Sequence, residues 1–358
     1  MADDTKESWP CTYKAINCKD PYGSISPYIS NLTFLRFINL QNNSFYGEIP
    51  HEVGHLFRLQ TLNLNNNTLE GEIPSSLSNY SNARFINLLW NGLNEKIPAE
   101  LGSLLKLKTL QLSGNNLIGE IPTSLLNLSS LKILSLSDNK LVGNIPKGIG
   151  NLKSFFFFSN LVNNLSGTIP SSLYNISSLQ TISFTENQLE GTLPENIGLT
   201  LPNLNSLLFV NNKFSGPIPV SLCNASQLQI LDLGENYLLG SVPTNLGNLP
   251  NFYWQALSDN DLGGSLDFLT SLTNCSKLEI MDLSTNQLGG VLPIFVGNLS
   301  TQLTELYFGS NEISGTIPVT LGNLVNLIAL GMEYNLFTGL IPTIFEKFQK
   351  IQIGFKWK

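Results

Sequence analysis

The chain has 358 residues, of which 42% are hydrophobic and 13% charged, and its net charge is −7 with an isoelectric point near 4.9. This acidic balance argues against a surface for nucleic acids or anionic membranes. No apolar run approaches the roughly 18 residues needed to cross a bilayer, and residues 1–4 do not begin an apolar signal segment. Length alone suggests two domains, but an internal repeat overrides that expectation.

The block Leu-x-x-Leu-x-Leu-x-x-Asn-x-Leu-x-Gly-x-Ile-Pro recurs along almost the whole chain. Its asparagines, called the ladder asparagines below, are Asn43, Asn67, Asn91, Asn115, Asn139, Asn163, Asn187, Asn212, Asn236, Asn260, Asn286, Asn311 and Asn335. Nine of the twelve intervals between them are 24 residues, two are 25 and one is 26. This spacing predicts one elongated domain, an α/β solenoid of about thirteen leucine-rich repeats.

Each repeat begins with a pattern typical of a strand that ends in a tight turn. In the second repeat, Leu59, Leu62, Leu64 and Leu69 fall on one interior line, while the residues between them alternate outward. Asn67 stands at the bend, where a turn stacked between its copies leaves backbone groups without water. Because an amide side chain both donates and accepts hydrogen bonds, we expect the ladder asparagines to be buried and structural.

The other arc of each repeat has apolar residues three apart, such as Val53, Leu56 and Leu59. Period three favours short 3₁₀ segments over long α-helices. Thirteen strands side by side are therefore expected to form a concave parallel sheet, with 3₁₀ or short helical segments on the convex side.

Four cysteines fall in two pairs. Cys11 and Cys18 precede the repeats, where a solenoid must cover its open end, and a disulfide between them would close a short loop. Cys223 and Cys275 lie on convex arcs two repeats apart, about 10 Å at the usual strand spacing, which exceeds disulfide reach. We expect these two to be buried thiols.

Asn-x-Ser/Thr sequons indicate glycosylation of a secreted protein, although an asparagine-rich chain also produces them by chance. Most fall in the same slot of the convex arc. The candidates are Asn31, Asn42, Asn66, Asn79, Asn127, Asn164, Asn175, Asn224, Asn274 and Asn298.

The repeat with Gly-x-Ile-Pro, together with the non-consensus stretches 267–278 and 297–303 and Ile25-Ser26-Pro27 ahead of residues 31–35, resembles a known class of proteins. The chain is similar, over about residues 8 to 352, to the extracellular domains of plant leucine-rich-repeat receptor-like kinases, in the subfamily that includes the bacterial elongation factor receptor. Residues 11–18 resemble that family's amino-terminal cap, with Tyr13 in place of Trp and Ala15 in place of Gly. The resemblance implies a right-handed superhelix, an extracellular or cell-surface (apoplastic) location, and a role in plant immune or developmental signalling.

The chain departs from that family at both ends. After Cys18 it passes directly to Gly23-Ser24-Ile25, so that the strand of the family's first repeat is expected to be missing. Residues 348–358 begin a further repeat without its asparagine, and no second cap, membrane span or kinase follows. We therefore expect an amino-terminal cap with a partial first repeat at residues 1–27, the repeats at 28–347, and a truncated repeat at 348–358.

One motif suggests catalysis. His51-Glu52-Val53-Gly54-His55 matches the zinc-protease pattern His-Glu-x-x-His, which needs both histidines on one face of a helix and a third ligand. Here the motif fills a slot of the convex arc, and the chain has no other histidine. We therefore expect no metal site, no cofactor, no catalytic residue and no enzymatic activity.

The candidate binding site is the concave face. Residues six, four, two and one positions before each ladder asparagine are expected to point outward there, and most are polar. Exposed aromatic and apolar exceptions are favoured binding anchors, although neighbouring strands could instead pack them against one another. The ligand-binding candidates are Phe85, Leu89, Trp90, Phe157, Leu161, Leu208, Val210, Trp254, Tyr307 and Tyr334, with Val162 beside them.

The later repeats add acidic residues to the same face, which suits a basic or amphipathic extended peptide. These residues are Glu186, Asp232, Glu235, Asp259, Asp282, Glu305 and Glu333. Some related peptide-hormone receptors hold a peptide carboxylate with a pair of arginines near the carboxy terminus, but no arginine follows Arg84 here.

The leading hypothesis is a recognition module that binds a peptide or protein ligand. By resemblance, a somatic-embryogenesis-type co-receptor kinase would dock beside the ligand. The alternative is a secreted inhibitor of microbial hydrolases such as polygalacturonase, a class that shares the repeat. Those inhibitors typically have ten repeats and two caps, which argues against this alternative.

Overall fold

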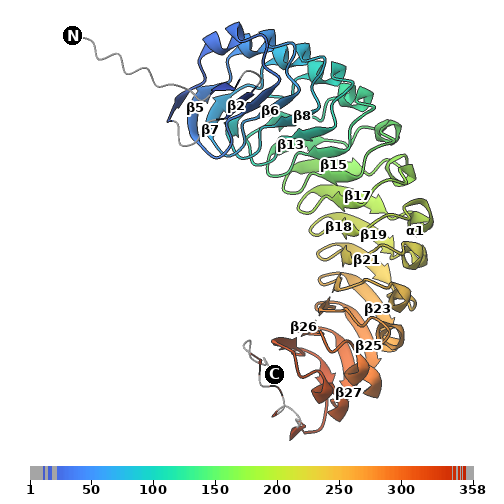
Figure 1. Cartoon of the computed structure of the whole chain (residues 1–358). Coiled ribbons are helices and arrows are strands. Elements are labelled where there is room, and N and C mark those ends of the chain that lie inside the picture. The colour runs from blue at the N-terminus through green and yellow to red at the C-terminus, as the bar shows by residue number, and fades with distance from the viewer. Residues whose placement is uncertain are drawn as a thin grey trace. The chain divides into compact units, whose positions relative to one another are not determined.

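The computed structural model describes residues 11–12, 15–17, 22–340, 342–343, 346, 348 and 350–351. The chain forms two compact units, Met1–Ser166 and Gly167–Lys358, called unit 1 and unit 2 below. Each unit repeats one turn: a short strand, a bend at the ladder asparagine, a second strand and a short helical arc (Figure 1). The solenoid expected from the sequence is confirmed.

The first strands of successive turns form a parallel sheet, called the main sheet below. In unit 1 its strands are, in spatial order, β1 Cys11–Thr12, β2 Ala15–Asn17, β4 Phe37–Asn39, β6 Thr61–Asn63, β8 Phe85–Asn87, β10 Thr109–Gln111, β12 Ile133–Ser135 and β14 Phe157–Ser159. In unit 2 they are β16 Thr181–Ser183, β18 Ser206–Leu208, β20 Ile230–Asp232, β22 Trp254–Ala256, β24 Ile280–Asp282, β26 Glu305–Tyr307 and β28 Ala329–Gly331. Equivalent residues of successive repeats pair directly, as Phe85 does with Thr61 and Thr109.

The second strands of the turns form two further parallel sheets, one of four strands and one of ten, which are together called the second sheet below. In unit 1 they are β3 Tyr22–Ser24, β5 Ser44–Glu48, β7 Thr68–Gly71 and β9 Gly92–Leu93, then β11 Ile118–Gly119, β13 Lys140–Gly143 and β15 Asn164–Thr168, whose last residues belong to unit 2. In unit 2 they are β17 Gln188–Thr192, β19 Lys213–Pro217, β21 Tyr237–Gly240, β23 Asp261–Ser265, β25 Gln287–Val291, β27 Glu312–Gly315 and β29 Leu336–Phe337.

The arcs lie on the side of each unit away from the main sheet (Figure 1). Those of unit 1 are the 3₁₀ segments η1 Pro27–Asn31, η2 His51–His55, η3 Ser75–Asn79, η4 Ala99–Ser103, η5 Thr123–Asn127 and η6 Ile149–Asn151. Those of unit 2 are η7 Leu173–Asn175, α1 Ile197–Thr200, η8 Val220–Asn224, η9 Leu246–Asn248, η10 Leu266–Phe268, α2 Leu269–Leu272, η11 Ile294–Asn298 and η12 Val319–Asn323. The 3₁₀ prediction is therefore confirmed for most arcs. The two α-helical turns occur in repeats lengthened to 25 and 26 residues, where the added residues lie in the arc.

The core of each unit fills the space between the sheets and the arcs. It is built from the repeated apolar positions, such as Leu62, Leu64 and Leu69, which are at most 2% exposed. Aromatic residues replace leucine at several core positions, and the rings of Phe184 and Phe209 in successive repeats stack 5.5 Å apart.

The amino-terminal segment adds strands to the main sheet. β2 pairs in parallel with β4, and β1 pairs with β2 in antiparallel orientation. This differs from the expectation that the first repeat lacks a strand, because residues 15–17 of the cap occupy that position. The Cys18 position and the side chain of Cys11 lie outside the described residues, so the disulfide prediction stays untested.

The ladder asparagines satisfy the turn backbone as expected. Asn115 donates to the carbonyl oxygens of Leu88 (3.0 Å), Leu112 (2.9 Å) and Ser113 (3.3 Å), and accepts from the N–H of Leu93 (3.1 Å). Two of these partners belong to the preceding repeat, so one side chain ties two turns together. Nine of the thirteen ladder asparagines, Asn115 and Asn139 among them, are buried as predicted, whereas Asn43, Asn91, Asn286 and Asn335 are half-buried.

Candidate ligand-binding face of the main sheet

The outward side chains of the main sheet and of the bend after it form a continuous surface within each unit, called the strand face below. Side chains alternate along a strand, so residues six and four positions before a ladder asparagine point away from the core. Residues two and one positions before it follow on the bend. All ten predicted ligand-binding residues lie on this face, either half-buried or exposed.

The bend residue immediately before each ladder asparagine adopts a left-handed backbone. Glycine and asparagine tolerate this conformation, and the first, second and fourth repeats have Asn42, Asn66 and Gly114 there. Trp90 and Val162 also adopt it, with φ near 52°, which is unusual for bulky and β-branched residues. The sequence predicted that these side chains lie on the face, but not that their backbone is left-handed. The Asn and Gly residues that recur at the same position in other repeats are the signal that indicates this conformation.

Trp90 is the most exposed tryptophan on the face of unit 1, with 57% of its surface accessible. Its ring lies over Gly114 in the next repeat, where an added Cβ would meet ring carbons at 2.4 to 2.9 Å. Phe85 and Leu89 of the same repeat are half-buried. Trp90 therefore contacts its neighbouring strand through one side and presents the rest of the indole to solvent, as a binding anchor requires.

Small hydroxyl side chains cover the face beyond Trp90. Ser113 and Ser135 share a hydrogen bond of 2.6 Å between their Oγ atoms, and Ser137 and Ser159 share one of 2.7 Å. Phe157, Leu161 and Val162 follow, all half-buried. In unit 1, the apolar groups around Trp90 and around Phe157 are thus separated by serines, called the serine floor below. This arrangement was not predicted from the sequence.

The face of unit 2 combines apolar and acidic side chains. Trp254 lies between Ile230 and Ile280 in register, and all three are half-buried. Leu208 pairs with Asp232 in the adjacent row, and Val210 is half-buried on the bend of the same repeat.

Asp232 and Asp282 lie two strands apart on this face, with the small side chain of Ala256 between them in register. Burial raises the pKa of Asp232 to about 6, and the carboxylates of Asp282 and Glu235 act in the same direction against the opposing N–H of Gly234. Asp232, Asp282 and Glu235 thus concentrate acidic side chains on this part of the face.

Tyr307 extends the acidic region. Its hydroxyl donates to Glu305 Oε2 at 3.2 Å, and its ring lies over Gly331 of the next repeat. Burial raises its pKa to about 12, with Glu305 and Asp282 contributing. Tyr334 is exposed on the following bend, with 56% of its surface accessible.

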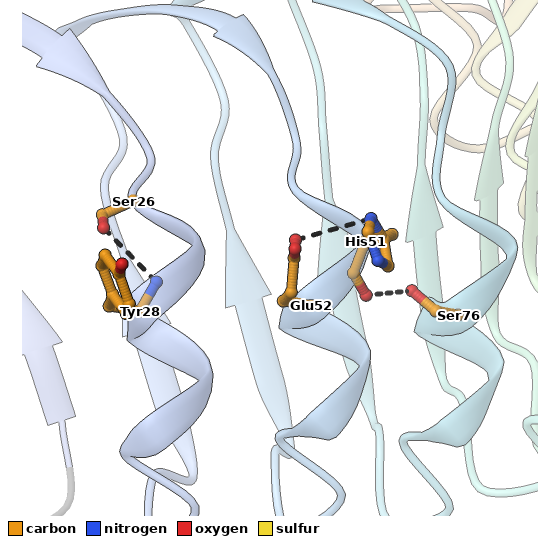
Figure 2. A network of polar contacts seen from close by, with 5 residues as sticks. All are labelled: Ser26, Tyr28, His51, Glu52 and Ser76. Carbon is orange, nitrogen blue, oxygen red and sulfur yellow. Dashed lines mark hydrogen bonds and ion pairs between the residues drawn. The ribbon is translucent and has the colours of Figure 1, made fainter.

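The His-Glu-x-x-His motif forms η2 on the arc side, remote from the strand face in the repeat (Figure 2). Residues four apart on a 3₁₀ segment point about 120° away from each other, whereas the protease pattern needs both histidines on one face. His51 contacts Glu52 (Nδ1 to Oε2, 3.5 Å), and its carbonyl oxygen accepts a 2.7 Å hydrogen bond from Ser76. Across the described residues, no three His, Cys, Asp or Glu side chains are arranged to hold a metal ion.

The remaining predicted positions lie away from the strand face or at its bends. Cys223 and Cys275 are free thiols as expected; Cys275 is buried, whereas Cys223 is half-buried and donates to Asn245 Oδ1 at 2.7 Å. The asparagine of every sequon is exposed. Six of them end 3₁₀ arcs, and these are Asn31, Asn79, Asn127, Asn175, Asn224 and Asn298.

Comparisons with known proteins fit this geometry. The profile of the Leucine Rich Repeat matches residues 34–56, 58–80, 106–128, 130–152, 227–249, 277–299 and 302–324. A leucine-rich-repeat protein of Leptospira interrogans is 30% identical, with a TM-score of 0.72 over 92% of this chain and 81% of that one. This chain belongs to the leucine-rich-repeat family.

Among leucine-rich-repeat structures, plant receptors match strongly. The plant peptide hormone receptor RGFR1, solved with RGF2, is 36% identical, with a TM-score of 0.88 over 94% of this chain. The Arabidopsis receptor kinase HAESA, solved with the peptide hormone IDA and the co-receptor SERK1, is 31% identical, with a TM-score of 0.84 over 92%. The chain spans 53% and 58% of the lengths of those two chains. A search of curated protein sequences gave no significant match.

The RGFR1 and HAESA structures share this fold. In the part of the chain that the structure describes, we find no helix with the length and apolar character needed to span a bilayer.

Proposed function

We propose that this leucine-rich-repeat chain is a non-catalytic, extracellular recognition module that binds an extended peptide, or a peptide segment of a protein, on its strand face. The exposed indole of Trp90 on a rigid, hydrogen-bonded sheet is the observation that carries the proposal. Similarity to RGFR1 and HAESA, both solved with peptides, supports the same ligand class.

Each unit favours its own ligand chemistry. In unit 1, Trp90 and Phe157 with the serines between them favour a peptide segment with apolar side chains and a backbone free to form hydrogen bonds. In unit 2, Asp232, Asp282 and Glu305 favour lysine or arginine, because a cation next to half-buried carboxylates is stabilised by their field. The proposed ligand is therefore a basic or amphipathic peptide.

We extend this proposal to signalling by analogy. The HAESA structure includes the co-receptor SERK1, so we propose a co-receptor kinase of that somatic-embryogenesis type as a second partner, docked near the carboxy-terminal repeats. The proposed setting is plant immune or developmental signalling at the cell surface. Exposed sequons support secretion through the glycosylating pathway.

Peptide selection on the full chain tests the proposal. A phage-displayed random library would supply peptides, whose affinities are then measured against wild type, Trp90→Asn and Tyr28→Asn. Asparagine is native at the Trp90 position in three other repeats, as Asn42, Asn66 and Asn211, and tolerates its backbone, so folding should be retained. Losing a tryptophan anchor costs about 2 kcal/mol, so we expect about a thirtyfold weaker complex for Trp90→Asn.

Tyr28 is the matched control, because it is an aromatic residue that is 79% exposed but lies in η1 on the arc side of its repeat. Tyr28→Asn should leave affinity within about twofold of wild type. Selected peptides that bind wild type and Trp90→Asn equally well, or that lose binding only with Tyr28→Asn, would refute a strand-face site.

A further inference from the structure

A row of residues runs along the amino ends of the main-sheet strands in unit 1. Each residue lies seven positions before a ladder asparagine, and a backbone hydrogen bond links it to the equivalent residue of the next repeat. The N–H of Gln60 donates to Arg36 O (2.8 Å), Arg84 to Gln60 O (2.8 Å), Lys108 to Arg84 O (2.9 Å) and Lys132 to Lys108 O (2.8 Å). These bonds place consecutive members one strand spacing apart, about 4.8 Å.

The row also includes Phe156, whose N–H donates to Lys132 O (3.0 Å). Four of its six members are cationic and exposed: Arg36, Arg84, Lys108 and Lys132. Arg58 and Lys106, both exposed, precede Gln60 and Lys108 by two residues and widen the row. The equivalent row of unit 2 contains no cation; its members are Gln180, Asn205, Gln229, Tyr253, Glu279, Thr304 and Ile328. The positive charge is therefore a property of unit 1 and not of the repeat, since the same backbone position holds neutral residues or Glu279 in unit 2.

These six cations, called the basic rim below, make no ion pair within the described residues, where the recorded pair is that of His51 with Glu52. Lys106 donates to the neutral amide of Asn82 at 2.8 Å. Four glutamates of unit 1, Glu48, Glu70, Glu72 and Glu95, follow the main strands of their repeats and surround a depression of about 500 Å³. Because the strands β4 to β12 are parallel, the basic rim and these glutamates lie towards opposite ends of the main strands.

Exposed apolar side chains are interleaved with the basic rim. Phe57 and Leu105, which directly precede Arg58 and Lys106, are 51% and 56% exposed, and Phe37, which follows Arg36, is 42% exposed. Exposed apolar side chains contribute neither to solubility nor to the binding of a hydrophilic polyanion. Cations alternating with apolar side chains are typical of a surface that binds another polypeptide.

We propose that the basic rim of unit 1 is a second interaction surface, distinct from the strand face, that docks an acidic, amphipathic segment of a partner protein. Carboxylates of that segment pair with Arg36, Arg84, Lys108 and Lys132, where each guanidinium group donates two parallel hydrogen bonds to a carboxylate. Its apolar residues cover Phe57 and Leu105. A polypeptide is favoured over an acidic polysaccharide because a polysaccharide would leave those apolar groups without partners.

Defined probes test the basic rim. We would measure the affinity of the full chain for a synthetic twelve-residue peptide of alternating Glu and Leu, for its Gln-for-Glu counterpart, and for polygalacturonate of equal charge. The acidic peptide should bind most tightly, and its binding should weaken with salt, as for exposed charges. Tighter binding of polygalacturonate, or equal binding of the Gln peptide, would overturn the proposal.

Matched variants locate the site. The double substitution Arg84→Gln and Lys108→Gln removes two exposed cations of the basic rim and should weaken acidic-peptide binding about fivefold or more. The control is the double substitution Lys96→Gln and Lys140→Gln, which changes the net charge equally. Both residues are exposed and follow the main strands of their repeats, so the affinity for the acidic peptide should change by less than about twofold. The charge-preserving pair Arg84→Lys and Lys108→Arg should restore binding.

Two further outcomes separate this surface from others. Trp90→Asn, on the strand face, should leave acidic-peptide binding unchanged, whether or not the strand-face proposal holds. Because Asn79 and Asn127 are exposed sequon asparagines in unit 1, the measurement is made on protein from a secreting host before and after deglycosylation. Equal weakening by the basic-rim pair and its control in both forms would contradict a localised site.

Discussion

Gln255 occupies a core position that leucine or isoleucine fills in most other repeats. The residue is completely buried, and neither Nε2 nor Oε1 has a hydrogen-bond partner among the described residues. A buried polar group without a partner costs about 1–3 kcal/mol. Comparison of this position among the repeats reveals the glutamine from the sequence alone. Only the structure shows that its amide has no hydrogen-bond partner among the described residues.

Gln255→Leu should therefore raise the free energy of unfolding by about 1–3 kcal/mol. Denaturant unfolding of the two proteins measures this, with Gln188→Leu, at an exposed position on β17, as the control expected within about 0.5 kcal/mol of wild type. A destabilised Gln255→Leu protein would show that the amide has a partner or a packing role of its own.

Asp232 gives a pH-dependent prediction. Its pKa in the folded chain is raised to about 6 from 3.8, so the protonated form is favoured by folding. Its contribution to stability is therefore complete below about pH 4 and is lost as the pH rises through about 6. Above that pH, the folded chain holds a carboxylate in a desolvated position.

At pH 7.5, Asp232→Asn should stabilise the chain by about 1 kcal/mol, a value reduced from the full shift because the side chain is partly exposed. The gain should disappear at pH 4. Unfolding free energies of the two proteins at both pH values provide the measurement, and a variant less stable than wild type at pH 7.5 would contradict the desolvation argument.

For individual residues, the sequence predicted which side chains face outward. It did not predict their backbone conformation or the residues that they contact. Trp90 was placed correctly on the strand face. Its left-handed backbone and its contact with Gly114 depend on two neighbouring repeats together, so periodicity within one repeat does not reveal them. Asp232 and Asp282 likewise lie on either side of Ala256 because of the register between strands, which the spacing in one strand does not reveal.

Among the elements, the bend that holds the ladder asparagine is the most completely predicted, because buried backbone groups require a side chain that both donates and accepts. Asn139 donates to Leu112 O (3.1 Å), Leu136 O (3.0 Å) and Ser137 O (2.9 Å), and accepts from Leu117 N–H (2.9 Å).

Asn139→Ala would leave these groups unsatisfied and should lower the free energy of unfolding by about 3 kcal/mol or more. Asn94→Ala, at an exposed position, is the control and should change it by less than about 0.5 kcal/mol. Equal effects of the two substitutions in denaturant unfolding would mean that water replaces the Asn139 amide.

The arcs were predicted less completely. Period three indicated 3₁₀ segments but did not show how closely successive arcs approach. A Cβ on Gly247 would lie 1.7 Å from the backbone oxygen of Ser271, so that arc requires glycine for contact between backbones. Short helical segments were expected on the convex side, but the sequence did not indicate which arcs form the α-helical turns α1 and α2.

For the whole molecule, the repeat predicted the fold because each turn repeats the same local solution. Ligand-binding surfaces do not repeat, so they were harder to predict. The serine floor beside Trp90 and the basic rim from Arg36 to Lys132 became visible only when equivalent residues of successive repeats were placed side by side.

The central claim is that the strand face binds a peptide, and photo-cross-linking tests it most directly. A peptide selected on the full chain would carry a benzoylphenylalanine, and its attachment sites would be mapped by mass spectrometry. The account predicts attachment to outward residues of the main-sheet strands and their bends, such as Phe85, Trp90 and Trp254. Attachment confined to the arcs or to the second sheet would contradict it.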